Sequence, residues 1–361
     1  GITENPGTTS VSSCICPPRT YDDGKGSCVP IEEGMRDDLS GMSLTSLTLE
    51  EGFWRTDATS SDVRSCVTPE ACVGGNDTDT TCRDGHTGPY CALCVDEYNL
   101  DPFMLCQKCS SSKRDLIFTA VVVVLVVLTF FGLNHFVKKK LGRGKRGKEI
   151  WKRCKNGVKI LFASGQITAS LPNVMPQVSL PENFEKVVEK TQFLNVNLFT
   201  LVPMGCFAGS RFNFYTKSVA MTMLVIILCA VLVLLAFFRK KPHLYTAAIA
   251  ITYMTLPTIT TTVFGMFPCD EFDNGSSFLR SDLSIDCNAE GRGAWELYGY
   301  LMVAIFPVGV TLLYFVLLFR MRDRLRGDDR MNDERLRGLV FLWEPYKKEY
   351  WWWEVFETLR R

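Results

Sequence analysis

The sequence predicts a small disulfide-rich extracellular domain followed by an α-helical polytopic membrane domain with about five spans. Residues 1–115 hold 10 of the 15 cysteines, 19 acidic and 9 basic residues, and no long apolar run. The long apolar runs all come after Asp115, and several could cross about 30 Å of hydrocarbon. This asymmetry divides the chain into a Cys-rich head at 1–113, a membrane domain at 114–319 and a cytosolic segment at 320–361.

Five segments are predicted to span the membrane. The run 116–137 carries no charged side chain over 22 positions. Two later segments compete for the second span because both are short: 158–171, extended toward Trp151, and 193–207. We favour the first as the span and interpret the second as a re-entrant or interfacial segment. The predicted spans are therefore about 116–137, 155–171, 218–238, 244–266 and 298–319.

Loop charge sets the orientation of these spans. The segment from Lys138 to Lys159 holds eleven Lys or Arg and one Glu, and the positive-inside rule places it in the cytosol. The loop from Phe267 to Glu296 has seven acids and two bases and falls on the opposite side. The head is therefore expected to be extracellular or lumenal, in a protein of the plasma membrane or an endomembrane.

This orientation decides how the stretch CALCVDEYNLDPFMLCQKC, from Cys91 to Cys109, is interpreted. Two CxxC pairs at this spacing suit either a zinc ribbon or a disulfide framework. An oxidising compartment favours disulfides, so no metal site is predicted, and the connectivity stays open. The head cysteines predicted to form disulfides are Cys14, Cys16, Cys28, Cys66, Cys72, Cys82, Cys91, Cys94, Cys106 and Cys109.

The outer loop carries its own predicted disulfide. Turn-forming residues lie between Cys269 and Cys287, and closing this loop should stabilise it by roughly 3 kcal/mol. Cys206 is the competing partner, because it is also expected near this face. Glycosylation sequons at Asn76 and Asn274 both fall outside in this topology, which agrees with the charge rule.

Several motifs carry a resemblance to known modules. GHTGPYCALC, from Gly85 to Cys94, resembles the G-x-x-G-P-x-C-x-x-C core of EGF-like and ephrin-receptor-like cysteine-rich modules. The loop from Cys269 to Cys287, the stretch FPVGVTLLYFVLL and the stretch LRGLVFLWEPYKKEYWWWEVFETLRR together resemble a group of uncharacterised multi-pass proteins of algae and oomycetes. In that group such a head is joined to a transmembrane domain similar to transient receptor potential channels. The resemblance implies further helices after Arg361, so this chain is expected to be an internal piece of a longer one.

Threonines follow one side of the predicted span 244–266. Thr252 is the first of four that recur at roughly helical spacing beside a proline, which frees a backbone carbonyl. Helix packing with hydroxyl-to-backbone bonds is one explanation, and a kinked, hydrated helix beside a permeation pathway is the other. The candidate pathway residues are Thr255, Thr258, Thr262, Pro257 and, on the following span, Pro307. We predict no carboxylate relay, voltage-sensing Arg ladder or proton path within the spans.

These features favour a channel-like, transient receptor potential-like membrane protein, cation-permeable, with an extracellular sensing or adhesion module. The acidic outer loop would concentrate cations through Asp270, Glu271, Asp273, Asp282 and Asp286. The alternative is a cell-surface receptor or adhesion protein whose helices anchor and signal without conducting ions.

No enzyme activity and no cofactor are predicted, because the chain has three histidines and no phosphate loop, nucleophile elbow or metalloprotease motif. His86, in a head loop, is expected to be solvated. The expected partners are the lipid bilayer, an extracellular ligand or matrix, and anionic lipid at the basic loop, with no nucleic acid; an oligomer is compatible with the sequence. WEPYKKEYWWWEVFETLRR is expected to form an interfacial amphipathic helix, with Trp351, Trp352 and Trp353 as membrane-interface rings.

Overall fold

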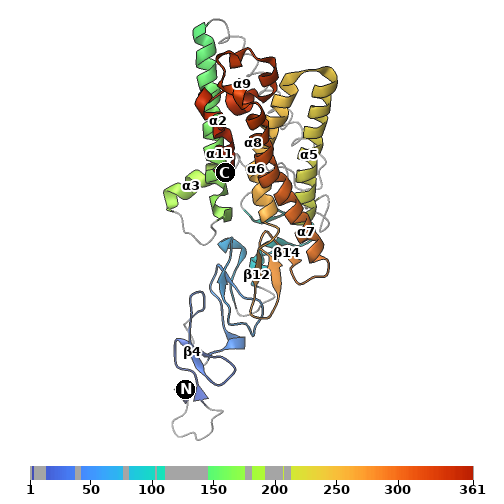
Figure 1. The fold of residues 1–361 in the computed structure, drawn as a ribbon. Coiled ribbons are helices and arrows are strands. Elements are labelled where there is room, and N and C mark those ends of the chain that lie inside the picture. The colour runs from blue at the N-terminus through green and yellow to red at the C-terminus, as the bar shows by residue number, and fades with distance from the viewer. Residues whose placement is uncertain are drawn as a thin grey trace. The chain divides into compact units, whose positions relative to one another are not determined.

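A computed structural model describes residues 2–3, 14–36, 42–75, 81–101, 104–109, 145–174, 181–191, 206 and 213–360, which belong to two compact units (Figure 1). The head unit comprises Gly1–Ser112, Pro203–Phe214 and Pro268–Arg292. The helical unit comprises Lys113–Val202, Tyr215–Phe267 and Gly293–Arg361. The head unit thus includes two segments beyond the predicted head, one before the helix that starts at Phe214 and one that forms the predicted outer loop.

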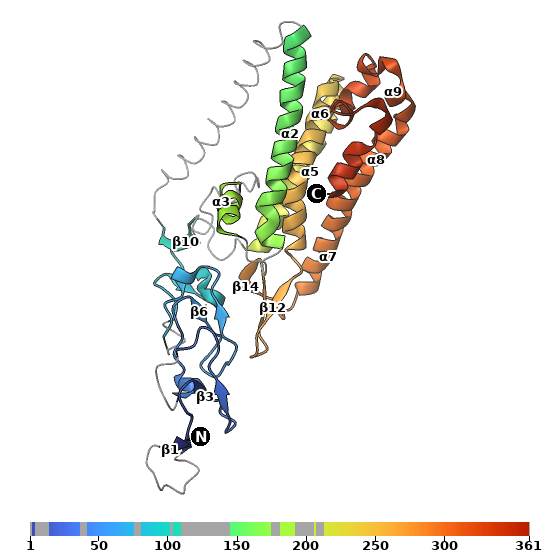
Figure 2. The same ribbon diagram turned by 90° about the vertical axis from the view of Figure 1, so that its left-hand side faces the viewer.

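The head unit consists of short strands and turns rather than extended sheets, as Figure 2 shows. In its N-terminal part, β3 (Thr20–Asp22) pairs antiparallel with β4 (Cys28–Pro30) and parallel with β5 (Met42–Ser43). The two-stranded pairs are β1 (Ile2–Thr3) with β2 (Cys14–Ile15), β6 (Phe53–Trp54) with β7 (Arg64–Ser65), β8 (His86–Thr87) with β9 (Leu93–Cys94), and β10 (Tyr98–Leu100) with β11 (Cys106–Lys108). Single 3-10 turns are η2 (Leu44–Ser46), η3 (Pro69–Ala71) and η4 (Pro89–Cys91).

The outer-loop hairpin is a three-stranded antiparallel sheet in the order β12 (Cys269–Glu271), β13 (Ser277–Leu279) and β14 (Asp282–Asp286). A tight turn between β12 and β13 is closed by Gly275, whose φ of 82° suits a residue without a Cβ atom. Cys269 forms a disulfide with Cys287, the pair that the sequence predicts.

Disulfides supply much of the order of the head unit, because its hydrophobic clusters are small. One cluster centres on Tyr21 and Leu47, and another on Trp54, Cys72 and Cys91. The other disulfides join Cys16 to Cys28, Cys66 to Cys72, Cys82 to Cys91, Cys94 to Cys106, and Cys109 to Cys206. Cys206, which we considered as a partner for the outer-loop cysteines, is therefore paired with the last cysteine of the head.

The helical unit is built from long helices followed by a compact run of short ones. The long elements are α2 (Lys145–Val174), α3 (Glu182–Thr191), α5 (Phe214–Arg239), α6 (Pro242–Phe264), and the continuous series α7 (Arg292–Val303), η8 (Ala304–Val310) and α8 (Thr311–Arg320). The short elements are α9 (Arg322–Arg326), η9 (Asp328–Met331), η10 (Glu334–Leu339), α10 (Val340–Trp343), η11 (Lys348–Tyr350) and α11 (Trp353–Arg360).

Three helices in the described part of the chain are long and apolar enough to cross a membrane: Phe214–Arg239, Pro242–Phe264 and Arg292–Arg320. They coincide with three of the five predicted spans. The predicted span 116–137 lies outside the described residues, as does 193–207 apart from Cys206. The remaining predicted span, 155–171, falls within the single helix α2, which is not among the three.

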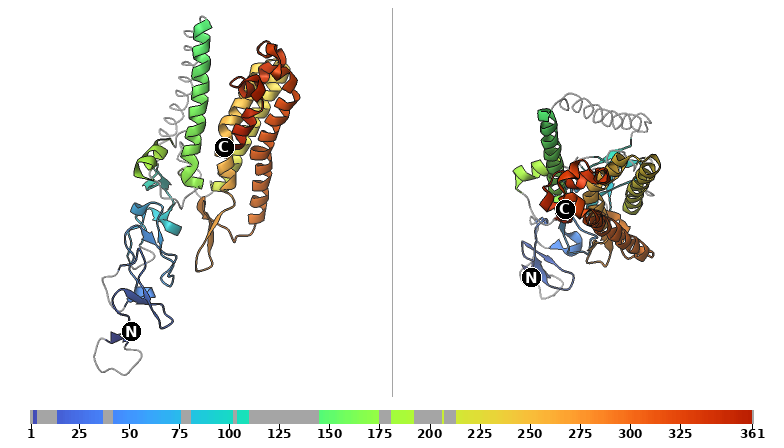
Figure 3. Two further views of the ribbon diagram at one scale, coloured as in Figure 1. Left: turned by 60° about the vertical axis from the view of Figure 1, so that its left-hand side comes forward. Right: turned by 45° about the horizontal axis from the view of Figure 1, so that its top comes forward.

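The core of the helical unit lies between α6 and the α7–α8 series, with residues of α5 joining it. Figure 3 gives two further views of these helices. Ile259 of α6, Phe306 of η8 and Leu318 of α8 are buried in it. In contrast, α5 exposes large apolar side chains such as Ile227 and Phe238, as expected of a helix in contact with lipid.

The C-terminal segment differs from the predicted amphipathic helix. Three short elements, α10, η11 and α11, take its place. The chain turns between α10 and η11 and again between η11 and α11. Trp343 and Trp351 are buried in the core of the helical unit, the latter beside Phe319, whereas Trp352 is exposed. Trp351 therefore packs inside the unit instead of serving as a membrane-interface ring.

Candidate functional site

The predicted threonine face of α6 is used in part for helix packing. Thr252 and the hydroxyl of Tyr314 on α8 are 2.6 Å apart, and Tyr314 donates to the Ile249 carbonyl at 3.1 Å. Thr255 donates to the Ile251 carbonyl of its own helix at 2.9 Å. These hydroxyls are satisfied by protein groups, which fits the packing explanation for this part of the face.

Thr258 differs from its neighbours. Its side chain is buried, with 6% exposure, and its hydroxyl has no hydrogen-bond partner among the described residues. Its carbonyl accepts a bond from Thr262 at 2.7 Å, and Pro257 beside it is buried as well. A buried hydroxyl without a protein partner is the kind of group that holds a water molecule or another polar species.

A π-helical turn interrupts the α7–α8 series at the predicted bend. Pro307 lacks the N–H that would bond to the Val303 carbonyl, and η8 widens the helix at this point. Gly309 fits the widened turn because a Cβ atom there would lie 2.8 Å from the Ala304 carbonyl oxygen. Since η8 packs against α6, Pro257 and Pro307 belong to adjacent helices.

One face of α2 also packs against α6. Ala163, Gln166 and Ala169 are buried on this face, and the small alanines allow the two backbones to approach closely. Gln166 donates from Nε2 to the Met254 carbonyl of α6 at 2.8 Å. That carbonyl is next to the Tyr253 carbonyl, which loses its helical donor because Pro257 has no N–H, so the amide of α2 bonds to α6 one residue away from the weakened position.

Lys159 lies two turns before Gln166 on α2, and its side chain brings a positive charge to the contact of α2 with α6 and α11. Its Nζ is 2.6 Å from Oε2 of Glu354 on α11 and donates to the Phe341 carbonyl at 3.3 Å. The ammonium also lies over two rings, 4.5 Å from the centre of Tyr253 and 4.2 Å from the centre of Phe341. Lys159 falls within the predicted span 155–171, and its pairing with Glu354, 195 residues later, was not indicated by the sequence.

Glu354 is the buried partner in this cluster, with 0% exposure. Its Oε2 also accepts from the Tyr346 hydroxyl at 2.9 Å, while Oε1 has no hydrogen-bond partner in the part of the chain that is described. Burial, and then the neighbouring Glu354 carboxylate, raises the pKa of Tyr346 well above its ordinary value. The tyrosine therefore remains a hydrogen-bond donor at neutral pH.

We define the α2–α6 seam as Lys159, Gln166 and Thr258. Thr258 follows Met254 by one helical turn, so it lies on the side of α6 that faces Gln166. The seam brings polar groups from both helices into an otherwise apolar unit. Of the predicted pathway residues it contains Thr258; the sequence did not point to Gln166 or to the pairing of Lys159.

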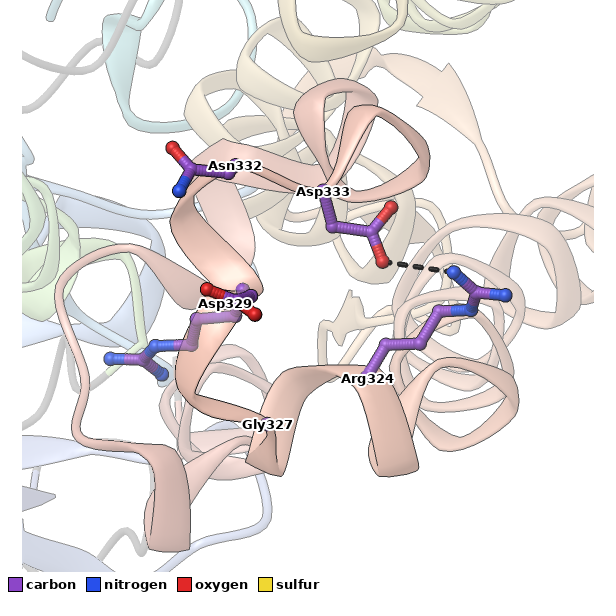
Figure 4. A pocket seen from close by; sticks show the side chains of 6 residues that line it. Arg324, Gly327, Asp329, Asn332 and Asp333 are labelled. Carbon is purple, nitrogen blue, oxygen red and sulfur yellow. Dashed lines mark hydrogen bonds and ion pairs between the residues drawn. The ribbon is translucent and has the colours of Figure 1, made fainter.

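A separate polar pocket of about 510 Å³ lies in the segment after α8 (Figure 4). In it, Arg324 donates to Asp333 at 3.0 Å, a bond that holds the pKa of Asp333 below its ordinary range. Arg330 donates to the Tyr346 carbonyl at 2.9 Å and lies over the ring of Trp343. Both arginines are thus engaged in structural contacts.

The acidic outer loop is less free than the sequence suggests. Asp270 is 2.7 Å from Arg280, Asp282 accepts from the backbone N–H of Phe214 at 2.8 Å, and Asp273 accepts from Ser60 at 2.7 Å. Three of the five acids expected to concentrate cations therefore have protein partners.

Two basic residues of the head, Arg55 and His86, are buried, which the sequence did not suggest. Arg55 has 1% exposure and donates to the carbonyls of Leu44 and Leu47, at 2.8 and 3.1 Å. His86, expected to be solvated, has 6% exposure: Nδ1 is 2.8 Å from the Cys91 carbonyl, and Nε2 accepts from the Cys106 N–H at 2.9 Å. This pattern requires the neutral ring with its proton on Nδ1. The prediction that His86 is solvated was wrong. A sequence does not show which backbone carbonyls and N–H groups of irregular loops need a side-chain partner, and His86 bonds to two of them.

The two sequons fall differently. Asn76 lies outside the described residues. Asn274 is exposed at the tip of the hairpin, where its Oδ1 accepts from the backbone N–H of Ser276 at 3.0 Å. Glycosylation of Asn274 stays a prediction.

Comparison with protein-family models, curated proteins and solved structures finds no match for this chain. The arguments about its function therefore depend on the geometry of its own residues.

Proposed function

We propose that this protein is a channel-like, cation-permeable integral membrane protein with an extracellular sensing head. The α2–α6 seam carries the proposal. Polar and ionisable groups inside membrane helices are costly and usually belong to a pathway or a binding site. In the seam, Gln166 and Thr258 lie beside the turn weakened by Pro257, and the hydroxyl of Thr258 has no protein partner among the described residues.

The proposed pathway is narrower than the threonine face predicted from the sequence. Thr252 and Thr255 are assigned to helix packing, because their hydroxyls bond to Tyr314 and to the Ile251 carbonyl. Thr258 remains beside the pathway, with Gln166 added from α2, and Thr262 is assigned to helix packing because its hydroxyl donates to the Thr258 carbonyl. The π-helical turn at Pro307 packs against α6 and supplies a bend that could widen the route.

The orientation follows the predicted topology of five spans, with 155–171 of α2 as the second. The basic end of α2 is then cytosolic, and the head and the hairpin are extracellular or lumenal. Tyr215 and Trp295 stack at 4.6 Å between ring centres near the N-terminal ends of α5 and α7, as suits an outer membrane interface.

The experiment is to reconstitute the protein in planar bilayers and record cation currents under stretch, voltage and calcium. Thr258→Leu and Gln166→Leu should change conductance or selectivity at least severalfold. Thr255→Val is the matched control on the same helix and should leave both unchanged. Absence of current from the wild type, or equal currents from wild type and both seam variants, would overturn the proposal.

A receptor or adhesion protein is the second candidate, favoured by the disulfide-stabilised head. In that case binding of an extracellular partner would change the conformation of the helical unit without any ion flux. Hydrogen exchange in α6, measured with and without the partner, together with flux assays on the same vesicles, separates the two functions.

A further inference from the structure

An aromatic side chain of the outer-loop hairpin is inserted into a surface of the head. Phe272, at the turn after β12, has 6% exposure. Its ring centre lies 5.6 Å from that of Trp54, in an edge-on arrangement, and 5.7 Å from that of Tyr90. Trp54 and Tyr90 are themselves 5.4 Å apart, so the three rings form one cluster.

Arg64 completes the surface that holds Phe272. Its guanidinium lies 4.6 Å from the centre of the Phe272 ring, and Nη2 donates to the Glu271 carbonyl at 2.7 Å. The same side chain is held in place by Tyr90, whose hydroxyl accepts at 3.0 Å, and by both carboxylate oxygens of Asp62 at 2.9 Å. The guanidinium is thus oriented by the head before it meets the hairpin.

Polar contacts surround this aromatic centre. Ser60 donates to Oδ2 of Asp273 at 2.7 Å, and Thr56 donates to Oδ1 at 3.3 Å. The described hydrogen bonds between the head and the hairpin all involve a side chain. A buried aromatic anchor held by Trp, Tyr and Arg inside a polar rim is the composition of a protein–protein binding hot spot.

Each side of this contact is constrained by disulfides of its own. Cys66–Cys72 and Cys82–Cys91 fix the head near Trp54 and Tyr90, and Cys269–Cys287 closes the hairpin. Each side is cross-linked within itself, and no disulfide among the described residues joins the hairpin to this surface, so the two surfaces can separate without breaking a covalent bond.

We propose that Trp54, Tyr90 and Arg64 form a binding site for a segment with an aromatic residue followed by an acid, and that Glu271-Phe272-Asp273 is its intramolecular ligand, with Glu271 contributing its backbone carbonyl. The partner that this site fits is an extracellular protein with an exposed loop in which a carboxylate directly follows an aromatic residue. Such a loop binds by displacing the hairpin, which joins α6 to α7 in the chain. Binding at this site does not require ion permeation, so the peptide-binding experiment tests this proposal independently of the proposed channel function.

The test uses the whole protein in lipid nanodiscs and a fluorescent cyclic peptide of residues 268–288, closed by its Cys269–Cys287 disulfide. Phe272→Ala in the protein vacates the site and should bind this peptide at least tenfold more tightly than the wild type. Adding Trp54→Ala to that variant should abolish the gain. A peptide carrying Phe272→Ala is the control probe and should not bind.

Asp273→Ala in the protein gives a second, milder variant, because it loosens the rim and leaves the aromatic cluster intact. Its peptide affinity should fall between those of wild type and Phe272→Ala, and disulfide mapping verifies that each variant keeps its native pairs. The proposal is overturned if Phe272→Ala and Asp273→Ala bind the peptide no better than wild type, or if binding persists in the Trp54→Ala double variant.

Discussion

The two units bury cationic side chains in different ways. In the head unit, Arg55 is satisfied by neutral backbone carbonyls, and burial lowers its pKa relative to an exposed arginine. In the helical unit, Lys159 meets the carboxylate of Glu354 between two aromatic rings. Irregular loops leave carbonyls free to accept from a guanidinium, whereas helices use their own carbonyls internally. The buried ammonium of Lys159 thus has a counter-charge, whereas the buried guanidinium of Arg55 has neutral acceptors.

Breaking the ion pair of the helical unit should have the largest effect. Glu354→Leu leaves Lys159 without its carboxylate and should lower the stability of the helical unit by about 3–5 kcal/mol. Thermal unfolding in detergent measures the loss. Replacing both residues, with Lys159→Met added, should recover most of it, because two apolar side chains can substitute for a buried pair.

The matched control for this change is Glu357→Leu on the same helix, whose carboxylate pairs with Arg360 at the surface. It should cost less than about 1 kcal/mol. Equal losses from the variants at 354 and 357 would contradict the special role of the buried pair.

The head should respond next most strongly to loss of its buried arginine. Arg55→Met leaves the carbonyls of Leu44 and Leu47 without their donor and should destabilise the head by about 2–3 kcal/mol. Denaturant unfolding followed by Trp54 fluorescence checks this value. Arg83→Met, at an exposed position, is the control, and an equal effect from it would show that burial of Arg55 does not matter.

A smaller loss is expected at His86. His86→Phe keeps a ring of similar shape but leaves the Cys106 N–H and the Cys91 carbonyl unpaired, at a cost of about 1–2 kcal/mol. Amide exchange at Cys106 should become faster in the variant, by at least tenfold. Unchanged exchange would mean that this N–H does not depend on the imidazole.

The smallest effect concerns Asp57 at the surface of the head. Hydrogen bonds from Thr59 hold the pKa of Asp57 below its ordinary value, so its contribution to stability is present at neutral pH and is lost as the pH falls below about 4. Asp57→Asn should therefore reduce the acid sensitivity of unfolding below that pH. If the free energy of unfolding depends on pH in the same way in the variant and the wild type, Asp57 does not contribute to the acid sensitivity of the head.

The sequence predicted those parts of the fold that depend on local pattern. Continuous apolar runs gave α5, α6 and the α7–α8 series, and two cysteines in one acidic loop gave the Cys269–Cys287 pair. Pro307, a candidate pathway residue, lies in the π-helical turn of this series, an irregularity that fits the donor that proline removes.

Features that depend on distant contacts could not be predicted in this way. Lys159 and Glu354 are separated by 195 residues, and Phe272 meets head residues more than 200 positions earlier, as the bond from Arg64 to Glu271 shows with a separation of 207. Each of these residues has an ordinary surface interpretation in its own neighbourhood. Only the folded chain brings the partners together.

The Cys109–Cys206 disulfide makes the chain between these two cysteines, which are 97 residues apart, a covalently closed ring. A protease that cuts one peptide bond within this ring opens it but separates nothing, because the disulfide still joins the two fragments. The head therefore stays attached to the helices after a single cleavage there, and only reduction of this disulfide releases it. Release of the head under oxidising conditions would require a cut on the N-terminal side of Cys109.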